Sequence, residues 1–203
     1  VMVLSDGSTS SDGVDNITGT IVTANEPIML SGTTSDGHVV GWTNIELAGT
    51  KFAYHPTRSD SQKVTVYALD TNVSDASVSG YINGVLSTSF TLSPGGDNLW
   101  TFNGAGKNIE LISDQDILVY SSANGADTTA IVPASNTIYG TISSTAVIGV
   151  IGNTAVDVSY SCSDGSSGTV QTGQTLSDDE TFYKGEACKY VASNNALIGA
   201  ISI

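Results

Sequence analysis

The stretch Leu111–Ser121 reads Leu-Ile-Ser-Asp-Gln-Asp-Ile-Leu-Val-Tyr-Ser, which is an apolar pair, a polar turn and an apolar strand. The same pattern occurs at Ile21–Ser31 and again at Tyr190–Ala200. The three copies begin at residues 21, 111 and 190, so they are 90 and 79 residues apart. Repeats of this length are too long for a solenoid and suit a small β-domain. The chain is therefore predicted to be built from repeated β-units.

The repeat extends beyond this motif. Further matching segments are Val64–Leu69 with Val147–Gly152, Val78–Gly84 with Val158–Asp164, and Asn108–Ile112 with Ala187–Val191. From them we predict a lead-in or linker over residues 1–16 and two repeat units, over residues 17–107 and 108–203. The second unit is expected to end in a strand that is shared with, or resembles, the next unit.

The local pattern between these matches is that of antiparallel strands. Apolar and polar residues alternate in Val64–Ala68 and Val78–Ile82, as in half-buried strands. Asx-Gly pairs such as Asn83-Gly84 and Asp164-Gly165 supply the positive φ that tight hairpins need. No segment keeps a helical period over three turns. We therefore predict an all-β fold of two tandem antiparallel sandwich-like units, with the first strand of a third.

The net charge of the chain restricts the classes of molecule that it can bind. The 203-residue chain has 20 acidic and 6 basic residues, and its net charge is −14. Nucleic acids and anionic membranes are bound through basic patches, so we expect neither partner. No run of eighteen apolar residues is present, and membrane insertion is not expected.

The two cysteines, Cys162 and Cys188, align with Ile82 and Ile109 of the first unit. Both are thus expected on inward-facing strand positions. One hypothesis is a disulfide that ties two strands and stabilises the unit by about 3 kcal/mol. The alternative is a pair of buried thiols that act as small hydrophobic side chains.

Signals for catalysis are missing from the sequence. The two histidines, His38 and His55, lie in no zinc-binding frame, and no Gly-x-Ser-x-Gly elbow is present. We expect a protein that is not an enzyme and has no cofactor. His55, in the polar and aromatic stretch Tyr54–Asp60, is a candidate ligand contact. The acidic turn Asp178–Glu180 is a candidate calcium site, although its spacing is not that of an EF-hand.

Trp42 and Trp100 are candidate ligand contacts as well. Together with several tyrosines, these rings could line a sugar-binding face, so surface glycans are a candidate partner. The alternative is that the rings pack in the core.

The order of segments in the second unit resembles a known family. Ile109–Ser121 is followed by Ala126–Pro133, by Tyr139-Gly140 and by the apolar strand Val147–Ile151. This order resembles the N-terminal β-repeats of IgGFc-binding-type proteins, which carry a Ser-Asp-x-Pro-Ile/Val strand. The resemblance implies an extracellular β-rich structural or adhesive module without catalysis.

The abundance of Ser, Thr, Gly and Asp is similar in style to tail, fibre and decoration proteins of marine phages. We therefore expect a non-catalytic structural module on a virion surface, or otherwise extracellular. It should assemble through sheet edges with copies of itself or neighbouring structural subunits. The alternatives are a secreted cell-surface adhesin or extracellular filament subunit, and a carbohydrate-binding module.

Overall fold

A computed structural model describes the backbone of residues 32–33, 39–40, 45–56, 61–103, 106–123, 129–141, 145–177 and 187–202. The chain divides into two compact units, Val1–Leu30 and Ser31–Ile203, and all described residues belong to the second. The predicted lead-in therefore lies outside the described residues. The described part is all-β and antiparallel, as predicted, and contains no α-helix. None of its helices is long and apolar enough to cross a membrane.

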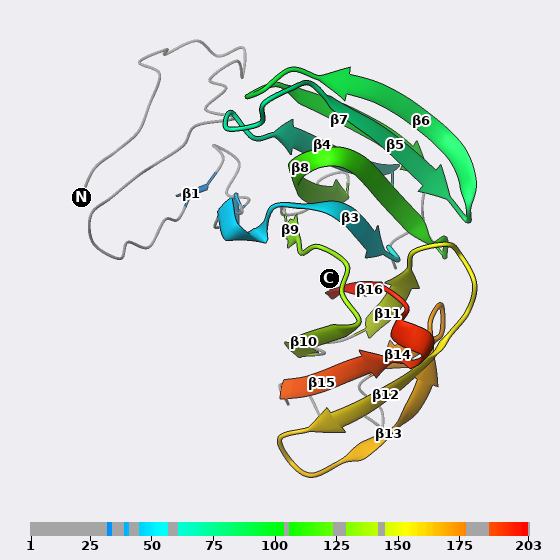
Figure 1. Ribbon diagram of the computed structural model, residues 1–203. Coiled ribbons are helices and arrows are strands. Elements are labelled where there is room, and N and C mark those ends of the chain that lie inside the picture. The colour runs from blue at the N-terminus through cyan, green and yellow to red at the C-terminus, as the bar shows by residue number, and fades with distance from the viewer. Residues whose placement is uncertain are drawn as a thin grey trace. The chain divides into compact units, whose positions relative to one another are not determined.

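The largest sheet has seven strands. They are β3 (Gly49–Tyr54), β4 (Ser61–Ala68), β5 (Ala76–Ile82), β6 (Val85–Leu92), β7 (Asp97–Asn103), β8 (Ile109–Ala123) and β9 (Thr129–Ile131). Their order is β6-β5-β8-β4-β7, and β3 and β9 also pair with β8. β8 is thus the central strand of a sheet that curls around it (Figure 1).

β8 contains the repeated motif and bends at its polar turn. The first half of β8 pairs with β5 and β3, and the second half pairs with β4 and β9. Between the two halves, β3 advances two residues, from Gly49 to Lys51, while β8 advances five, from Ile117 back to Ile112. The extra residues form a bulge, which bends the strand and increases its twist. The backbone N–H of Ser77 donates to Asp114 Oδ1 (2.7 Å) and holds this bulge.

The concave side of the curled sheet is filled by apolar side chains. β4 alternates between buried and less buried positions, as the sequence predicts for a half-buried strand. Each fully buried Val, Ile or Phe side chain contributes about 1.5–3 kcal/mol relative to an exposed one. The fully buried apolar members of this first core include Phe52, Tyr54, Val64, Val66, Ile109, Leu111 and Ile117.

The second half of the chain forms two smaller sheets around its own core. One has the order β10-β15-β12-β13 and the other β14-β11-β16. The strands are β10 (Thr137–Thr141), β11 (Thr145–Val150), β12 (Asp157–Cys162), β13 (Ser167–Gln171), β14 (Thr175–Ser177), β15 (Ala187–Ala192) and β16 (Ile198–Ser202). Ile148, Val158 and Ile198 are among the side chains buried in this second core. Short elements elsewhere are β1 (Gly32–Thr33), β2 (Val39–Val40) and the 3₁₀ helices η1 (Ile45–Leu47) and η2 (Ser193–Asn195).

Both halves have the same strand topology. The order β10-β15-β12-β13 repeats β3-β8-β5-β6, and β14-β11-β16 repeats β7-β4-β8. The bent strand β8 corresponds to β15 and β16 together, with η2 at the polar turn. The motif therefore lies at the bend of β8 in the single sheet of the first half, and between the two smaller sheets of the second half. Residues 109–123, assigned by sequence to the unit 108–203, pair with strands from residues 49–103 and with β9.

Candidate functional site

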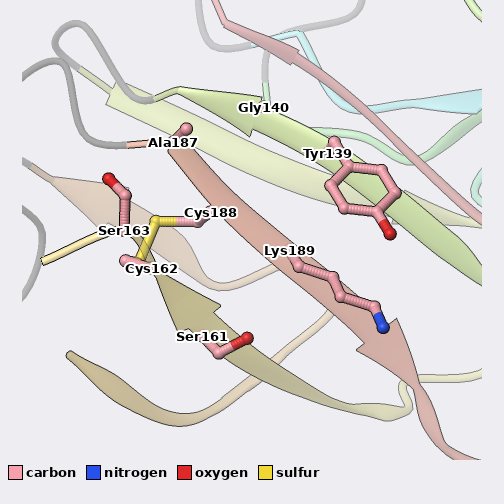
Figure 2. A pocket seen from close by; sticks show the side chains of 8 residues that line it. All are labelled: Tyr139, Gly140, Ser161, Cys162, Ser163, Ala187, Cys188 and Lys189. Atoms are coloured by element: carbon pink, nitrogen blue, oxygen red, sulfur yellow. A yellow bond between two sulfur atoms is a disulfide. The ribbon is translucent and has the colours of Figure 1, made fainter. Parts of the chain in front are cut away.

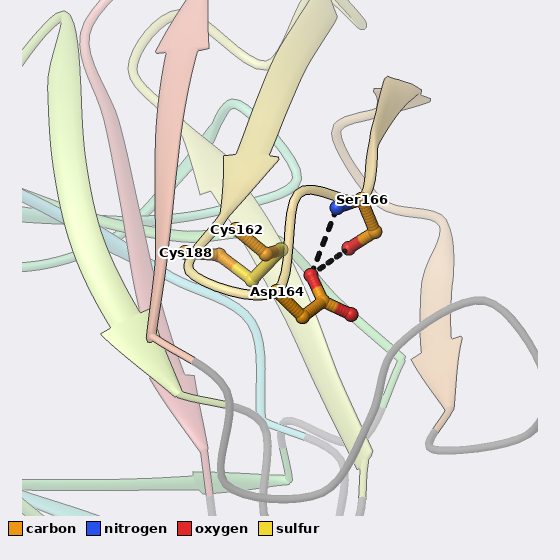
Figure 3. The surroundings of a disulfide bond; sticks show 4 residues. All are labelled: Cys162, Asp164, Ser166 and Cys188. Atoms are coloured by element: carbon orange, nitrogen blue, oxygen red, sulfur yellow. Dashed lines mark hydrogen bonds between the residues drawn. A yellow bond between two sulfur atoms is a disulfide. The ribbon is translucent and has the colours of Figure 1, made fainter.

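The two cysteines are joined by a disulfide between the neighbouring strands β12 and β15 (Figure 3). Cys162 and Cys188 are opposite one another in the register, as Ile82 and Ile109 are in the first half. The disulfide thus replaces an apolar cross-strand pair of the repeat. Residues 163–166 connect β12 to β13, and Asp164 Oδ1 accepts bonds from the Ser166 N–H (2.8 Å) and Oγ–H (2.7 Å). These bonds hold the pKa of Asp164 below its ordinary value.

A shallow groove of about 350 Å³ lies beside the disulfide (Figure 2). In the register, Tyr139 is opposite Lys189, and Lys189 is opposite Ser161, so the three residues form a row across β10, β15 and β12. Tyr139 is 75% exposed. An exposed aromatic ring beside an ammonium group can stack on a sugar ring and donate hydrogen bonds to its oxygens.

The aromatic candidates from the sequence occupy other places. Trp100 is buried in the first core, where its ring lies 4.3 Å from that of Phe102 between centroids. Its ring is therefore part of the core, which was the alternative interpretation. Trp42 lies outside the described residues.

His55 is buried and only 9% exposed. It lines a small cavity of about 140 Å³ together with Asn83, Asn108 and Thr172, among others. Within the described part of the chain, its Nδ1 atom has no hydrogen-bond partner. Burial lowers the pKa of His55 from its ordinary value of 6.5, and a bond with the Pro56 backbone acts in the opposite direction.

Asn108 and Glu110 connect the two halves through buried hydrogen bonds. Asn108 Nδ2 donates to the Val150 carbonyl (2.8 Å), and the Val150 N–H donates to Asn108 Oδ1 (2.9 Å). Asn108 Nδ2 also donates to Glu110 Oε1 (3.1 Å), and the Gly152 N–H donates to Glu110 Oε2 (2.8 Å). We call Asn108, Glu110, Val150 and Gly152 the polar joint. Sequence analysis missed it, although two polar residues alternate there with buried Ile109 and Leu111.

The open edges of the large sheet are a further candidate surface. β6 and β7 are the terminal strands of its path, and no described strand pairs with their outer sides. β6 has eight residues, none charged, and its Val85 is 70% exposed. A long uncharged edge offers unpaired backbone N–H and C=O groups to another strand.

The described residues contain no group of side chains that could bind a metal ion. None of their His, Cys, Asp and Glu side chains forms a cluster of three or more that could hold an ion. The candidate calcium turn Asp178–Glu180 lies outside the part that the structure describes.

Neither a protein-family model nor a curated protein matches this chain, and no solved structure matches it.

Proposed function

We propose that this chain is a non-catalytic structural module of a virion exterior, such as a tail, fibre or decoration subunit. It assembles through sheet edges with copies of itself or with neighbouring structural subunits. The observation that carries the proposal is the uncharged outer edge of β6, with exposed Val85 and Leu86 at its start. Monomeric β-proteins usually protect such edges with charged residues or proline, and Val85–Leu92 contains neither.

The charge of the chain is consistent with a role in assembly. A net charge of −14 keeps a protein soluble through mutual repulsion, so a contact between copies has to be made where charge is absent. The strand β6 meets that condition. Its side chains are Val, Leu, Ser, Thr and Phe, most of which have high β-propensity.

Light scattering coupled to gel filtration, with negative-stain imaging, tests this proposal. The purified chain should form oligomers or filaments, and the double variant Ser87→Lys/Ser89→Lys should reduce them at least tenfold by charging the edge. The matched control is Ser159→Lys/Ser161→Lys, which adds the same charge to exposed positions of β12, an interior strand. A chain that stays monomeric at all concentrations would contradict the proposal.

A secreted adhesin or extracellular filament subunit is the first alternative. Its support is the disulfide, since disulfides persist in oxidising compartments outside the cytosol. Immunogold labelling distinguishes the two locations. Label on purified virus particles supports the virion module, and label on cell surfaces or extracellular filaments supports the alternative.

A carbohydrate-binding module is the second alternative, favoured by the groove at Tyr139 and Lys189. A glycan array with the purified chain tests it. Binding should fall at least tenfold in Tyr139→Ala and stay unchanged in Val73→Ala, which truncates an exposed side chain elsewhere. Absence of binding to any glycan would exclude this function.

A further inference from the structure

In the first half, a tyrosine lies beside the cross-strand pair that corresponds to the disulfide. Ile109 on β8 lies in the register between Ile82 on β5 and Tyr54 on β3. Residues directly opposite one another in neighbouring strands point to the same face of a sheet, so these three side chains form one row. Tyr54 and Ile109 are fully buried in the first core. The tyrosine therefore fills the space at the β3 end of the row.

The second half has no side chain at the place of this tyrosine. Cys188 on β15 lies in the register between Cys162 on β12 and Gly140 on β10. Gly140 therefore corresponds to Tyr54. Gly140 is exposed, and a Cβ atom at that position would meet no atom within 4 Å. The space that the tyrosine fills in the first half is thus open beside the disulfide, where Gly140 and both cysteines line the groove of about 350 Å³ (Figure 2).

A disulfide in an open groove is accessible to thiols. In thiol–disulfide exchange, a thiolate attacks one sulfur of the disulfide and the other sulfur leaves as a thiolate. The groove has the size of a site for a small molecule. Among the described residues that line it, Lys189 is the only charged one, and its ammonium group attracts a thiolate. The groove therefore suits a small thiol as its occupant.

We propose that this groove is a reaction site for low-molecular-mass thiols, which open the Cys162–Cys188 disulfide while the chain is folded. The inference goes beyond the proposed function, since it needs neither assembly nor a bound glycan. It makes the disulfide a site of modification in addition to a link between two strands.

The position of the groove assigns the sulfur that is attacked. β15 lies between β10 and β12, so a thiolate that enters the space at Gly140 approaches Cys188 Sγ from the side away from Cys162. That is the in-line direction for displacement of the Cys162 sulfur. Cys162 is only partly buried, whereas Cys188 is buried, so water solvates a leaving thiolate better at Cys162.

The reaction has two steps. In the first step, a bond forms between the sulfur of the thiol and Cys188 Sγ, the bond between the two cysteines breaks, and Cys162 takes the electron pair and then a proton. In the second step, a further thiol attacks the sulfur of the first one and releases Cys188 as a thiol. Two small thiols are thereby oxidised to one disulfide, and the protein disulfide is reduced to two thiols.

The rate of reduction by dithiothreitol tests the proposal on the wild-type chain. The reaction is run at about pH 8, where part of the reagent is thiolate, and samples are alkylated with iodoacetamide and weighed by mass spectrometry. The rate should rise in proportion to the dithiothreitol concentration and stay unchanged in urea below the unfolding transition. A rate that rises steeply with urea and levels off with dithiothreitol would overturn the inference, because reduction would then require unfolding.

The variant Gly140→Tyr restores the tyrosine of the first half and should slow reduction at least tenfold. The φ angle of Gly140 is not positive, so a side chain can be placed there. The matched control is Thr169→Tyr, which adds the same ring at an exposed position of β13 outside the groove and should keep the wild-type rate. A folded Gly140→Tyr variant with an unchanged rate would overturn the inference. If this variant does not fold, the urea dependence of the wild type still decides.

Peptide mapping after a short exposure to 2-mercaptoethanol tests which sulfur is attacked. Trypsin separates the two cysteines, because it cleaves after Lys184 and Lys189. Mercaptoethanol should be found on Cys188 and the alkyl group on Cys162, and the reverse pattern would overturn the assigned direction of attack. A monomeric chain with a reactive disulfide would contradict the proposed function alone. An assembling chain whose disulfide resists thiols until it unfolds would contradict this inference alone.

Discussion

At the scale of single residues, Asn108 has the most connections in the joint between the two halves. Its side chain pairs with both backbone groups of Val150, as a strand neighbour would, and its backbone exchanges bonds with Asn83. A buried polar group that loses its hydrogen-bond partner destabilises the fold. Removing the Asn108 side chain would therefore cost both its own hydrogen bonds and the satisfaction of the groups it leaves behind.

We predict that Asn108→Ala lowers the free energy of unfolding by about 3 kcal/mol, because the Val150 N–H and C=O groups lose their buried partner. Urea unfolding measures the change. Asn98→Ala, which truncates the same side chain on β7, is the control and should cost less than about 1 kcal/mol. If both variants lost the same free energy of unfolding, the hydrogen bonds of the polar joint would add no stability beyond that of an ordinary asparagine side chain.

His55 is the residue whose environment predicts a pH effect. Its pKa is below 6.5 in the folded chain, so the unfolded chain binds the proton more readily. The neutral imidazole therefore stabilises the fold above about pH 6.5, and this contribution decreases as the pH falls from 6.5 toward the folded pKa. An NMR titration of the imidazole should give a pKa below 6.5, and His55→Gln should flatten the stability profile between pH 7 and 5. A titration midpoint above 6.5 would contradict the prediction.

At the scale of elements, the two glycines Gly149 and Gly199 let the small sheet approach β3. They are directly opposite one another in β11 and β16. A Cβ atom on Gly149 would lie 2.7 Å from the Tyr54 nitrogen, and one on Gly199 would meet the Ala53 carbonyl. In the first half, the pair at the corresponding position of the register is Tyr67 and Leu118, both with large side chains. The close approach is therefore specific to this joint.

We expect Gly149→Ala to destabilise the chain by about 2 kcal/mol or more, since the backbone of β3 cannot move aside for a methyl group. Gly140→Ala is the matched control, because a Cβ at that strand position meets no atom within 4 Å. Thermal and urea unfolding of both variants measure the difference. If Gly149→Ala were as stable as Gly140→Ala, the space between Gly149 and the Tyr54 backbone would have to be large enough for a methyl group.

The disulfide covalently links the neighbouring strands β12 and β15. Replacing both cysteines in Cys162→Ala/Cys188→Ala should lower the free energy of unfolding by about 3 kcal/mol, through the greater freedom of the unfolded chain. Cys162→Ile/Cys188→Ile, which copies the pair Ile82 and Ile109, is the comparison and should recover part of the packing term. A loss below about 1 kcal/mol in the alanine variant would show that the covalent link adds little.

At the scale of the whole molecule, two apolar cores lie within the one compact unit Ser31–Ile203. They are connected by the polar joint and by the glycine contact, both of which need the two halves folded. We therefore expect a single cooperative unfolding transition, with equal calorimetric and van't Hoff enthalpies. Asn108→Ala/Gly149→Ala should separate it into two transitions. Two transitions in the wild type would show that the halves fold independently.

Local patterns predicted most of the strands. The alternation in Val78–Ile82 and the match to Val158–Asp164 correspond to β5 and β12. The alignment of the repeat was enough to match the two cysteines with Ile82 and Ile109. In the structure, the residues of each pair lie opposite one another in the strand register. The predicted polar turn between Ile112 and Ile117 is instead a bulge inside the continuous strand β8, because strands on both sides keep it paired.

By itself, the sequence determined the all-β class, the repetition and the opposing positions of the cysteines. These follow from residue periodicity and turn chemistry, which act over a few neighbours. Only the tertiary structure decided that Asn108 pairs with Val150, that Gly149 and Gly199 lie against β3, and that Trp100 is buried. Those contacts join residues far apart in the chain, and which of them form depends on how whole sheets pack.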